Sequence, residues 1–389
     1  MNLDKKRILW IDGLRGIACL CIFFHHWLSA FFYAAILGEI QYVHTSNLMD
    51  MKFSRSPLSF WANGNFMVCI FCMVTGLVLT LQIMQVDHKH TAKVLIKRYF
   101  RLALPLFAVS AVVYLMLKYS LFHNAEAAGL SASDWLGKYY TTPVSWKVLL
   151  KESFVTTWLF GRDTFSTAFW MMNLMFFGSY LVYAFGIAAK INKWAGVILT
   201  VLASLVMVYM NQLLMLNFCI GFLIALVMAK SKKKISNILV IPGIVLIIAG
   251  AWFGGFPAYA VPDGKYMWLT LTLGNYGISL QTVEHGMHII GATLFMIGLA
   301  LSKPLQNILE SKVCIFMGRI SYGVYLIHIP VLFSFGCWFF LLIFGYTGNY
   351  QLTSVIAFVV TMAVIILLAW AFNSLVEKNI GKILKKIFG

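Results

Sequence analysis

The chain has 389 residues, of which 61% are hydrophobic and only 11% are charged. This composition excludes a soluble globular protein and indicates an integral membrane protein with many spans. The formal net charge of +17 does not indicate a nucleic-acid-binding protein, because most Lys and Arg residues flank apolar segments on one predicted side of the membrane. That side is the cytoplasmic one by the positive-inside rule, and both termini are predicted to lie on it.

Hydropathy predicts about ten transmembrane helices, so the expected fold is an all-α integral membrane protein. Residues 1–389 are expected to form a single transmembrane domain with no appended soluble domain. The outer segment 121–165 contains a candidate interfacial helix, Val148–Phe160. The overlong span 313–343 is expected to tilt or break near Pro330. The predicted spans are 8–31, 64–85, 102–120, 168–189, 195–211, 213–229, 236–253, 282–301, 313–343 and 352–375, followed by a basic amphipathic tail, Glu377–Phe388.

The first predicted span carries polar residues that are costly inside a bilayer, which makes it a candidate functional segment. Arg15 and His26 are eleven residues apart, which at about 100° per residue places them within roughly 20° of the same helix face. One face would therefore carry a cation near the inner side and an imidazole about 16 Å further out. The alternative is structural: Arg15 would extend to lipid headgroups beside Asp12, and His26 would be a hydrogen-bonded core residue.

A basic segment precedes the third predicted span. Lys97, Arg98 and Arg101 lie within one helical turn of each other, and Pro105 is expected in the first turn of the span 102–120, where its missing N–H does least harm. Clustered cations of this density can bind phosphate groups. They can equally hold anionic lipid headgroups at the inner membrane surface.

No metal or disulfide centre is expected. Glu284 and His288 share a face of the eighth predicted span, but the cluster lacks a second set of ligands, and a hydrogen-bonded cluster is the favoured interpretation. The seven cysteines lie in or beside apolar spans and imply no disulfide framework.

The ninth predicted span carries a polar stripe. Ser321, Tyr325 and His328 fall at positions i, i+4 and i+7 of an otherwise apolar helix. Such residues either serve a site or form hydrogen bonds between helices. The spacing does not separate the two interpretations.

Six segments resemble the membrane-bound acyltransferase family 3, which includes bacterial O-acyltransferases of surface polysaccharides. The resemblance covers nearly the whole chain. Its most specific parts are the opening motif, in which ten residues separate Arg15 from His26, and the signature of the ninth span. Two positions depart from the family pattern: Thr75 replaces a usual serine, and Met175 stands where relatives have an acidic residue five positions after the Trp, here Trp170. The segments are DGLRGIACLCIFFHH, CIFCMVTGLVLT, KRYFRLALPL, LNFCIGFLIALV, GRISYGVYLIHIP and VEKNIGKILKKI.

This resemblance implies a multi-pass plasma-membrane enzyme, of the kind found in the bacterial inner membrane. It would move an acyl group, acetyl being the first candidate, from cytoplasmic acetyl-CoA or another acyl-CoA to a hydroxyl of an extracytoplasmic glycan or lipid-linked acceptor. No metal is implied, and the acceptor, the acyl chain and the oligomeric state stay open. The resemblance implies CoA phosphate binding by Arg15, Lys97, Arg98 and Arg101, and catalysis by Arg15, His26, Tyr325 and His328.

Within the implied site, His26 would act as general base or as nucleophile. Tyr325 and His328 would orient it or stabilise an oxyanion. Met175 would change how the acceptor is handled. The alternative function is a secondary transporter of an organic anion, without covalent chemistry. Inverted repeats are typical of such transporters, and the sequence shows no convincing internal repeat.

Overall fold

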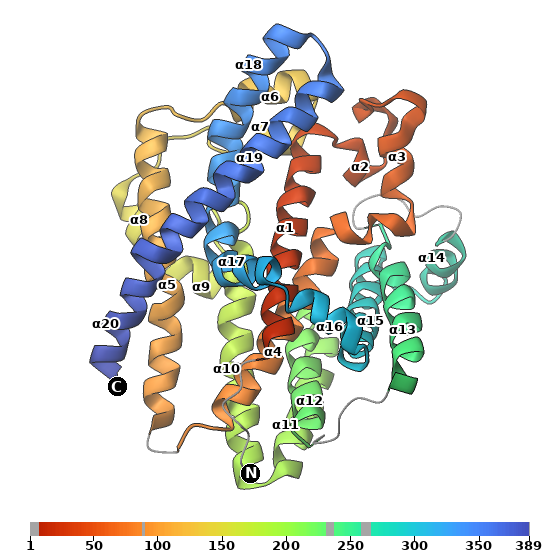
Figure 1. Ribbon diagram of the computed structural model, residues 1–389, viewed down its shortest axis with the longest axis vertical. Coiled ribbons are helices and arrows are strands. Elements are labelled where there is room, and N and C mark those ends of the chain that lie inside the picture. Colours follow the sequence, from red (N-terminus) through yellow and green to blue (C-terminus); the bar gives the residue numbers. More distant parts are fainter. Residues whose placement is uncertain (1–7, 88–89, 231–236, 258–265, 389) are drawn as a thin grey trace.

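The computed structural model describes residues 8–87, 90–230, 237–257 and 266–388. Within these ranges all regular secondary structure is helical, and no strand occurs (Figure 1). The predicted all-α class is therefore confirmed. The N-terminal basic residues Lys5, Lys6 and Arg7, and Pro262 of a predicted outer loop, lie outside the described residues. The orientation of the termini stays a prediction.

Seven helical segments of the described chain are long and apolar enough to cross a membrane. Three shorter apolar helices, of 15 to 17 residues, overlap three further predicted spans. At about 1.5 Å per residue they fall short of a hydrocarbon core of roughly 30 Å, so the predicted number of ten depends on them. The long segments are α1 (Leu9–Phe31), α4 (Gly64–Ile83), α5 (Thr91–Lys118), α10 (Trp170–Ile191), α15 (Leu280–Leu301), Lys312–Thr347 and Tyr350–Phe388. The short ones are α11 (Lys193–Tyr209), α12 (Leu216–Lys230) and α13 (Val240–Gly254).

Two of the long segments contain a π-helical turn. Lys312–Thr347 comprises α17 (Lys312–Val331), η8 (Leu332–Gly336) and α18 (Cys337–Thr347). Tyr350–Phe388 comprises α19 (Tyr350–Phe372), η9 (Asn373–Glu377) and α20 (Lys378–Phe388). The helix continues through Pro330 without a break, and the π-helical turn η8 directly follows the proline.

Shorter elements lie over the predicted outer ends of the spans. They include α2 (Ala34–Leu37), α3 (Met49–Ser54), η3 (Pro57–Ala62), α6 (Asn124–Ser131) and α7 (Asp134–Gly137). The predicted interfacial helix Val148–Phe160 corresponds to a longer helical run made of α8 (Trp146–Lys151), η5 (Glu152–Thr156) and α9 (Thr157–Phe160). α14 (Met267–Gly274) lies before α15 in the chain, and α16 (Lys303–Leu309) lies between α15 and α17.

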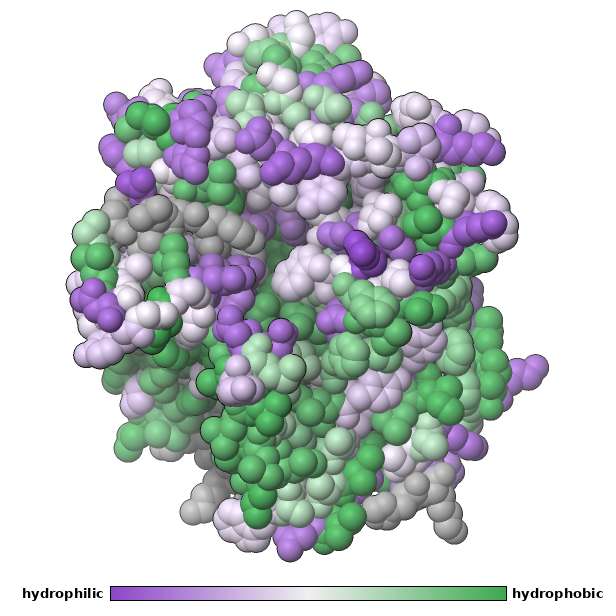
Figure 2. Space-filling model, turned by 180° about the vertical axis from the view of Figure 1, so that it is seen from behind, coloured by the Kyte–Doolittle hydropathy of each residue, from purple (hydrophilic) through white to green (hydrophobic). Residues whose placement is uncertain are grey.

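α1 occupies the middle of the bundle (Figure 1). Its aromatic side chains Phe23, Trp27 and Phe31 are buried, and Phe23 stacks on Phe358 of α19 with ring centroids 5.6 Å apart. The surface carries the apolar side chains expected of a membrane protein. On the face shown in Figure 2, apolar side chains cover the lower part, whereas polar side chains gather toward the upper end.

Glycines allow α1 and α17 to pack with their backbones almost in contact. A Cβ atom added at Gly318 of α17 would lie 2.0 Å from the backbone oxygen of Asp12, and one added at Gly16 would lie 2.5 Å from the backbone nitrogen of Gly318. Small residues at helix interfaces are how membrane helices approach closely, because burial from water does not drive their association. The polar residues of α1 thereby come within hydrogen-bonding distance of α17.

Replacing Gly318 by alanine is expected to lower stability, because the new methyl group cannot fit without separating α1 from α17. Overpacking of this kind costs about 1–3 kcal/mol. The midpoint of thermal unfolding in detergent should fall. Gly345→Ala in α18 is the matched control, since a Cβ atom there meets no atom within 4 Å. Equal midpoints for the two variants would contradict the packing argument.

Candidate active site

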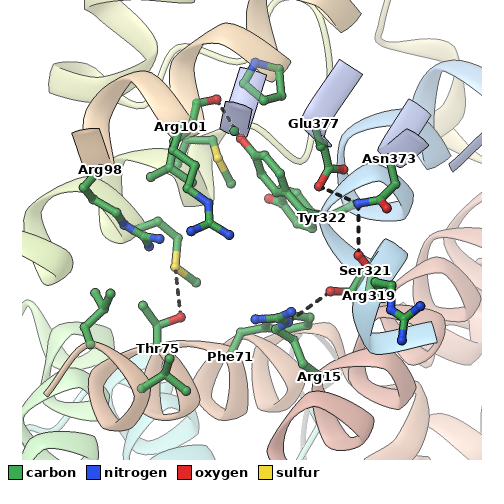
Figure 3. Close-up of a pocket in the computed structure, with 18 of the residues that line it drawn as sticks. Arg15, Phe71, Thr75, Arg98, Arg101, Arg319, Ser321, Tyr322, Asn373 and Glu377 are labelled. Carbon is green, nitrogen blue, oxygen red and sulfur yellow. Dashed lines mark hydrogen bonds between the residues drawn. The ribbon is translucent and has the colours of Figure 1, made fainter. Parts of the chain in front are cut away.

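A cavity of about 610 Å³ opens at the predicted inner end of the bundle. α1, α4, α5, α10, α17 and the segment from η9 to α20 contribute to its wall (Figure 3). Its lining is strongly basic, and Glu377 is the acidic side chain among the described lining residues. The cations of the lining are Arg15, Lys97, Arg98, Arg101, Arg319, Lys378 and Lys385. Such a cavity suits a ligand that carries several negative charges.

Arg15 is held against α17. Its Nε donates to the hydroxyl of Ser321 over 3.1 Å, and its Nη2 donates to the backbone oxygen of Gly318 over 2.9 Å. Asp12, one turn earlier on α1, lies 3.5 Å from the same guanidinium. The guanidinium is thus fixed at the cavity wall, facing Arg98 and Arg101 across the space (Figure 3).

The predicted basic cluster lines the opposite wall. Lys97, Arg98 and Arg101 all reach the cavity from α5, and Arg98 donates to the hydroxyl of Ser179 of α10 over 3.1 Å. Tyr322 of α17 donates to the backbone oxygen of Leu102 over 2.7 Å, which ties α17 to this part of α5.

The predicted position of Pro105 in a first helical turn is wrong. α5 begins at Thr91, so Pro105 lies in the interior of the helix. The prediction placed the helix start by hydropathy alone, but the polar residues before 102 are helical too. Pro105 also lines the cavity, where the missing N–H leaves the helix without its bond to the carbonyl of Arg101.

His26 of α1 and His328 of α17 form a hydrogen-bonded pair further along the bundle. His328 Nδ1 lies 2.8 Å from the backbone oxygen of Tyr325 and 3.1 Å from that of Val324, and its Nε2 lies 3.1 Å from Nδ1 of His26. Carbonyl oxygens only accept, so Nδ1 of His328 carries the proton, and in an uncharged ring Nε2 is an acceptor. His26 therefore donates from Nδ1, which leaves the lone pair of its Nε2 available for chemistry.

Tyr325 separates the cavity from this histidine pair. It lines the cavity, whereas His26 and His328 are not among the lining residues, and its ring centroid lies 5.8 Å from that of His328. Its hydroxyl donates to the backbone oxygen of Ala168, in the segment before α10. The cavity thus ends one helical turn from His328.

Aromatic side chains cover the pair from the outer elements. Trp135 of α7 stacks on His26 with ring centroids 5.5 Å apart, and contacts Tyr139 and Phe333 edge-on. His26 is only partly buried, unlike His328. Nearby, burial raises the pKa of Tyr139, and the charge of Asp163 adds to that effect. Sequence reasoning did not find Trp135, because nothing in its local pattern marks it.

Glu284 and His288 of α15, considered above as a metal site or a hydrogen-bonded cluster, belong to a hydrogen-bond network separate from the cavity. Asn63 donates to the backbone oxygen of Phe256 over 2.8 Å, and Nε2 of His288 lies 2.9 Å from the same oxygen. Asn65 donates to Glu284. Among the described residues, no group of three or more His, Cys, Asp or Glu side chains is arranged to hold a metal ion.

The two departures from the family pattern face each other in the cavity. Thr75 of α4 and Met175 of α10 both line it, with the threonine hydroxyl 3.6 Å from the methionine sulfur. Asn173 instead donates to the backbone oxygen of Trp158 over 2.8 Å and does not line the cavity. Met175 thus leaves this wall apolar.

The cavity wall also contains residues that sequence reasoning missed. They are Arg319 of α17, Asn373 and Glu377 of η9, and Lys378 and Lys385 of α20. The amphipathic pattern of the tail was the available signal, but it does not say which face of the helix meets the bundle.

Comparisons with known proteins point to one class of enzyme. The family model described as "Acyltransferase domain" matches residues 8–373. The chain is 21% identical to "Acyltransferase clz18" of Cochliobolus lunatus over 456 aligned positions, which cover 99% of this chain and 96% of that protein. It is 28% identical to "Acyltransferase R4" of Phoma sp. over 151 residues, which cover 37% of this chain and 31% of that protein. No solved structure matches the chain significantly.

Replacing His328 by alanine is expected to lower kcat for acyl transfer by roughly 10²–10⁴-fold, because His26 loses the partner that fixes its tautomer. His328→Gln should recover part of the loss, since its side-chain oxygen can accept from Nδ1 of His26. The KM for the donor should change little, because His328 does not line the cavity. His285→Ala on α15 is the control, and equal losses for the alanine and glutamine variants of His328 would contradict the tautomer argument.

Proposed function

Because the chain belongs to acyltransferase family 3, we propose that it transfers an acyl group from cytoplasmic acyl-CoA to a hydroxyl of an extracytoplasmic glycan or related acceptor. The observation that carries this proposal is a basic inner cavity that ends at Tyr325, next to the His26–His328 pair. Acetyl-CoA is the first donor to test. The membrane would be the plasma membrane.

The charge of the cavity supports a phosphate-bearing donor. Coenzyme A carries several phosphate oxygens, and Arg15, Lys97, Arg98 and Arg101 offer guanidinium and ammonium donors from two facing walls. With the phosphates at these cations, the pantetheine arm would extend along the apolar wall near Met175. The thioester would then lie beside Tyr325.

The chemistry of transfer needs a base with a free lone pair. In one version, Nε2 of His26 takes the proton of the acceptor hydroxyl while that oxygen bonds to the thioester carbon. The C–S bond then breaks, and the thiolate of CoA takes the proton from His26. In the other version, Nε2 itself bonds to the acyl carbon, the C–S bond breaks, and CoA leaves as a thiolate. The acceptor oxygen then displaces the imidazole from the acyl carbon, and the hydroxyl proton passes to the CoA thiolate. Both versions need His26 with its proton on Nδ1 and the lone pair on Nε2, which is the tautomer that the hydrogen bond to His328 favours.

Tyr325 is the proposed oxyanion donor. Its hydroxyl donates to the backbone carbonyl of Ala168, and turning that donor to the thioester oxygen would stabilise the tetrahedral intermediate. Because its ring lies between the cavity and the histidine pair, the same movement would bring the thioester toward His26.

The acceptor is proposed to approach from the outer side, where Trp135 stacks on His26 and in turn contacts Tyr139 and Phe333. Aromatic faces with polar edges suit the alternating apolar and hydroxyl surfaces of a sugar ring. The names of the relatives specify acyl transfer and no acceptor.

The first test is transfer from radiolabelled acetyl-CoA in inside-out membrane vesicles that contain the protein. Alkali-labile product is expected with the wild type and with His285→Ala. His26→Ala should lower its rate by roughly 10²–10⁴-fold at matched expression. Equal labelling with His26→Ala would remove His26 from the mechanism. Uptake of an organic anion without any covalent product would favour a transporter instead.

The same vesicles separate the two versions of the chemistry. Labelled protein recovered after rapid denaturation in the absence of acceptor, and absent with His26→Ala, would indicate an acyl-imidazole intermediate. Transfer to acceptor without labelled protein would indicate general-base catalysis.

A further inference from the structure

The C-terminal helix α20 is a part of the cavity wall. It follows α19 through η9 and packs along α5, and the ring of Phe388 stacks on that of Phe100 with centroids 6.3 Å apart. Figure 1 shows α20 beside the inner half of α5. The basic cluster of α5 and this helix therefore border the same space.

The lysines of α20 divide between two faces. Lys378, Gly381, Leu384 and Lys385 line the cavity, whereas Lys382 and Lys386 do not. Leu384 is 3% exposed. Ile383 and Ile387, one turn apart, are 55% and 65% exposed and form an apolar face suited to lipid. One face of the helix thus meets the cavity and another meets the membrane.

The π-helical turn η9 sets this orientation. It adds one residue to the turn, which rotates the following helix by about 100° relative to an uninterrupted α-helix. Asn373 stabilises the turn by donating to Glu377 over 3.1 Å and to the backbone oxygen of Arg319 over 3.3 Å (Figure 3). The same turn brings Glu377 to the cavity wall among the cations.

We propose that α20 is a wall of the donor site and that Lys378 and Lys385 bind the phosphate groups of the donor nucleotide. This proposal rests on the proposed function, because it takes acyl-CoA as the donor. It assigns a binding role to a tail whose basic amphipathic pattern would otherwise indicate attachment to anionic lipid. The other face of α20, which carries Lys382, Lys386, Ile383 and Ile387, would contact the lipid.

The test compares two double variants on one helix. K378A/K385A removes the lysines at the cavity, and K382A/K386A removes the same charge from the same helix away from it. All four lysines are exposed, so neither variant should disturb packing. KM and kcat are measured in inside-out vesicles with acetyl-CoA and with acetyl-pantetheine, which lacks the phosphates.

K378A/K385A is expected to raise the KM for acetyl-CoA roughly tenfold with little change in kcat, because charged hydrogen bonds to phosphate are lost. The KM for acetyl-pantetheine should stay unchanged, and K382A/K386A should match the wild type with both donors. An unchanged KM for K378A/K385A, or an equal rise for both pairs, would overturn the assignment. If wild-type protein transfers nothing from acyl-CoA, the proposed function itself fails, which is a distinguishable result.

Discussion

The close contact between α1 and α17 is the constraint on which the site depends. Gly16 and Gly318 let the two backbones approach, and the approach places Arg15 beside Ser321 and His26 beside His328. In a bilayer, apolar side chains gain little by leaving lipid for protein, so van der Waals contact and hydrogen bonds between helices carry more of the stability. The same glycines therefore serve packing and position both candidate groups, and α1 has little freedom to shift without losing them.

Along α1 the surroundings change from charged to uncharged. At the predicted inner end, cations from several helices border an open cavity, where water and counter-ions can reduce their mutual repulsion before a ligand binds. Beyond Tyr325 lie the imidazole rings of His26 and His328, which are hydrogen-bonded to each other and, from His328, to backbone carbonyls. A donor with charged phosphates and an uncharged acyl arm matches this order, since each part would meet surroundings of its own polarity.

Much of the fold could be predicted from the sequence because hydropathy and the helical repeat are local properties. Helices of the structure begin and end within a few residues of the predicted spans, except for α5, whose polar first turns hide its start at Thr91. Periodicity placed Arg15 and His26 on one face and Tyr325 and His328 on one stripe. It could not show that these faces meet, nor that Arg319, Lys378 and Lys385 join them, because those contacts depend on helix packing and on the π-helical turn η9.

The π-helical turn η9 also bears on how the end of the chain tolerates changes in length. In a surface loop, one residue more or less alters the connection and leaves the flanking elements in place. In η9 the loss of one residue would restore an ordinary α-helical turn and rotate every later residue by about 100° around the helix axis. Aligned relatives that differ by one residue here would present different side chains to the cavity despite similar composition. A single-residue gap in this segment is therefore a change of binding surface.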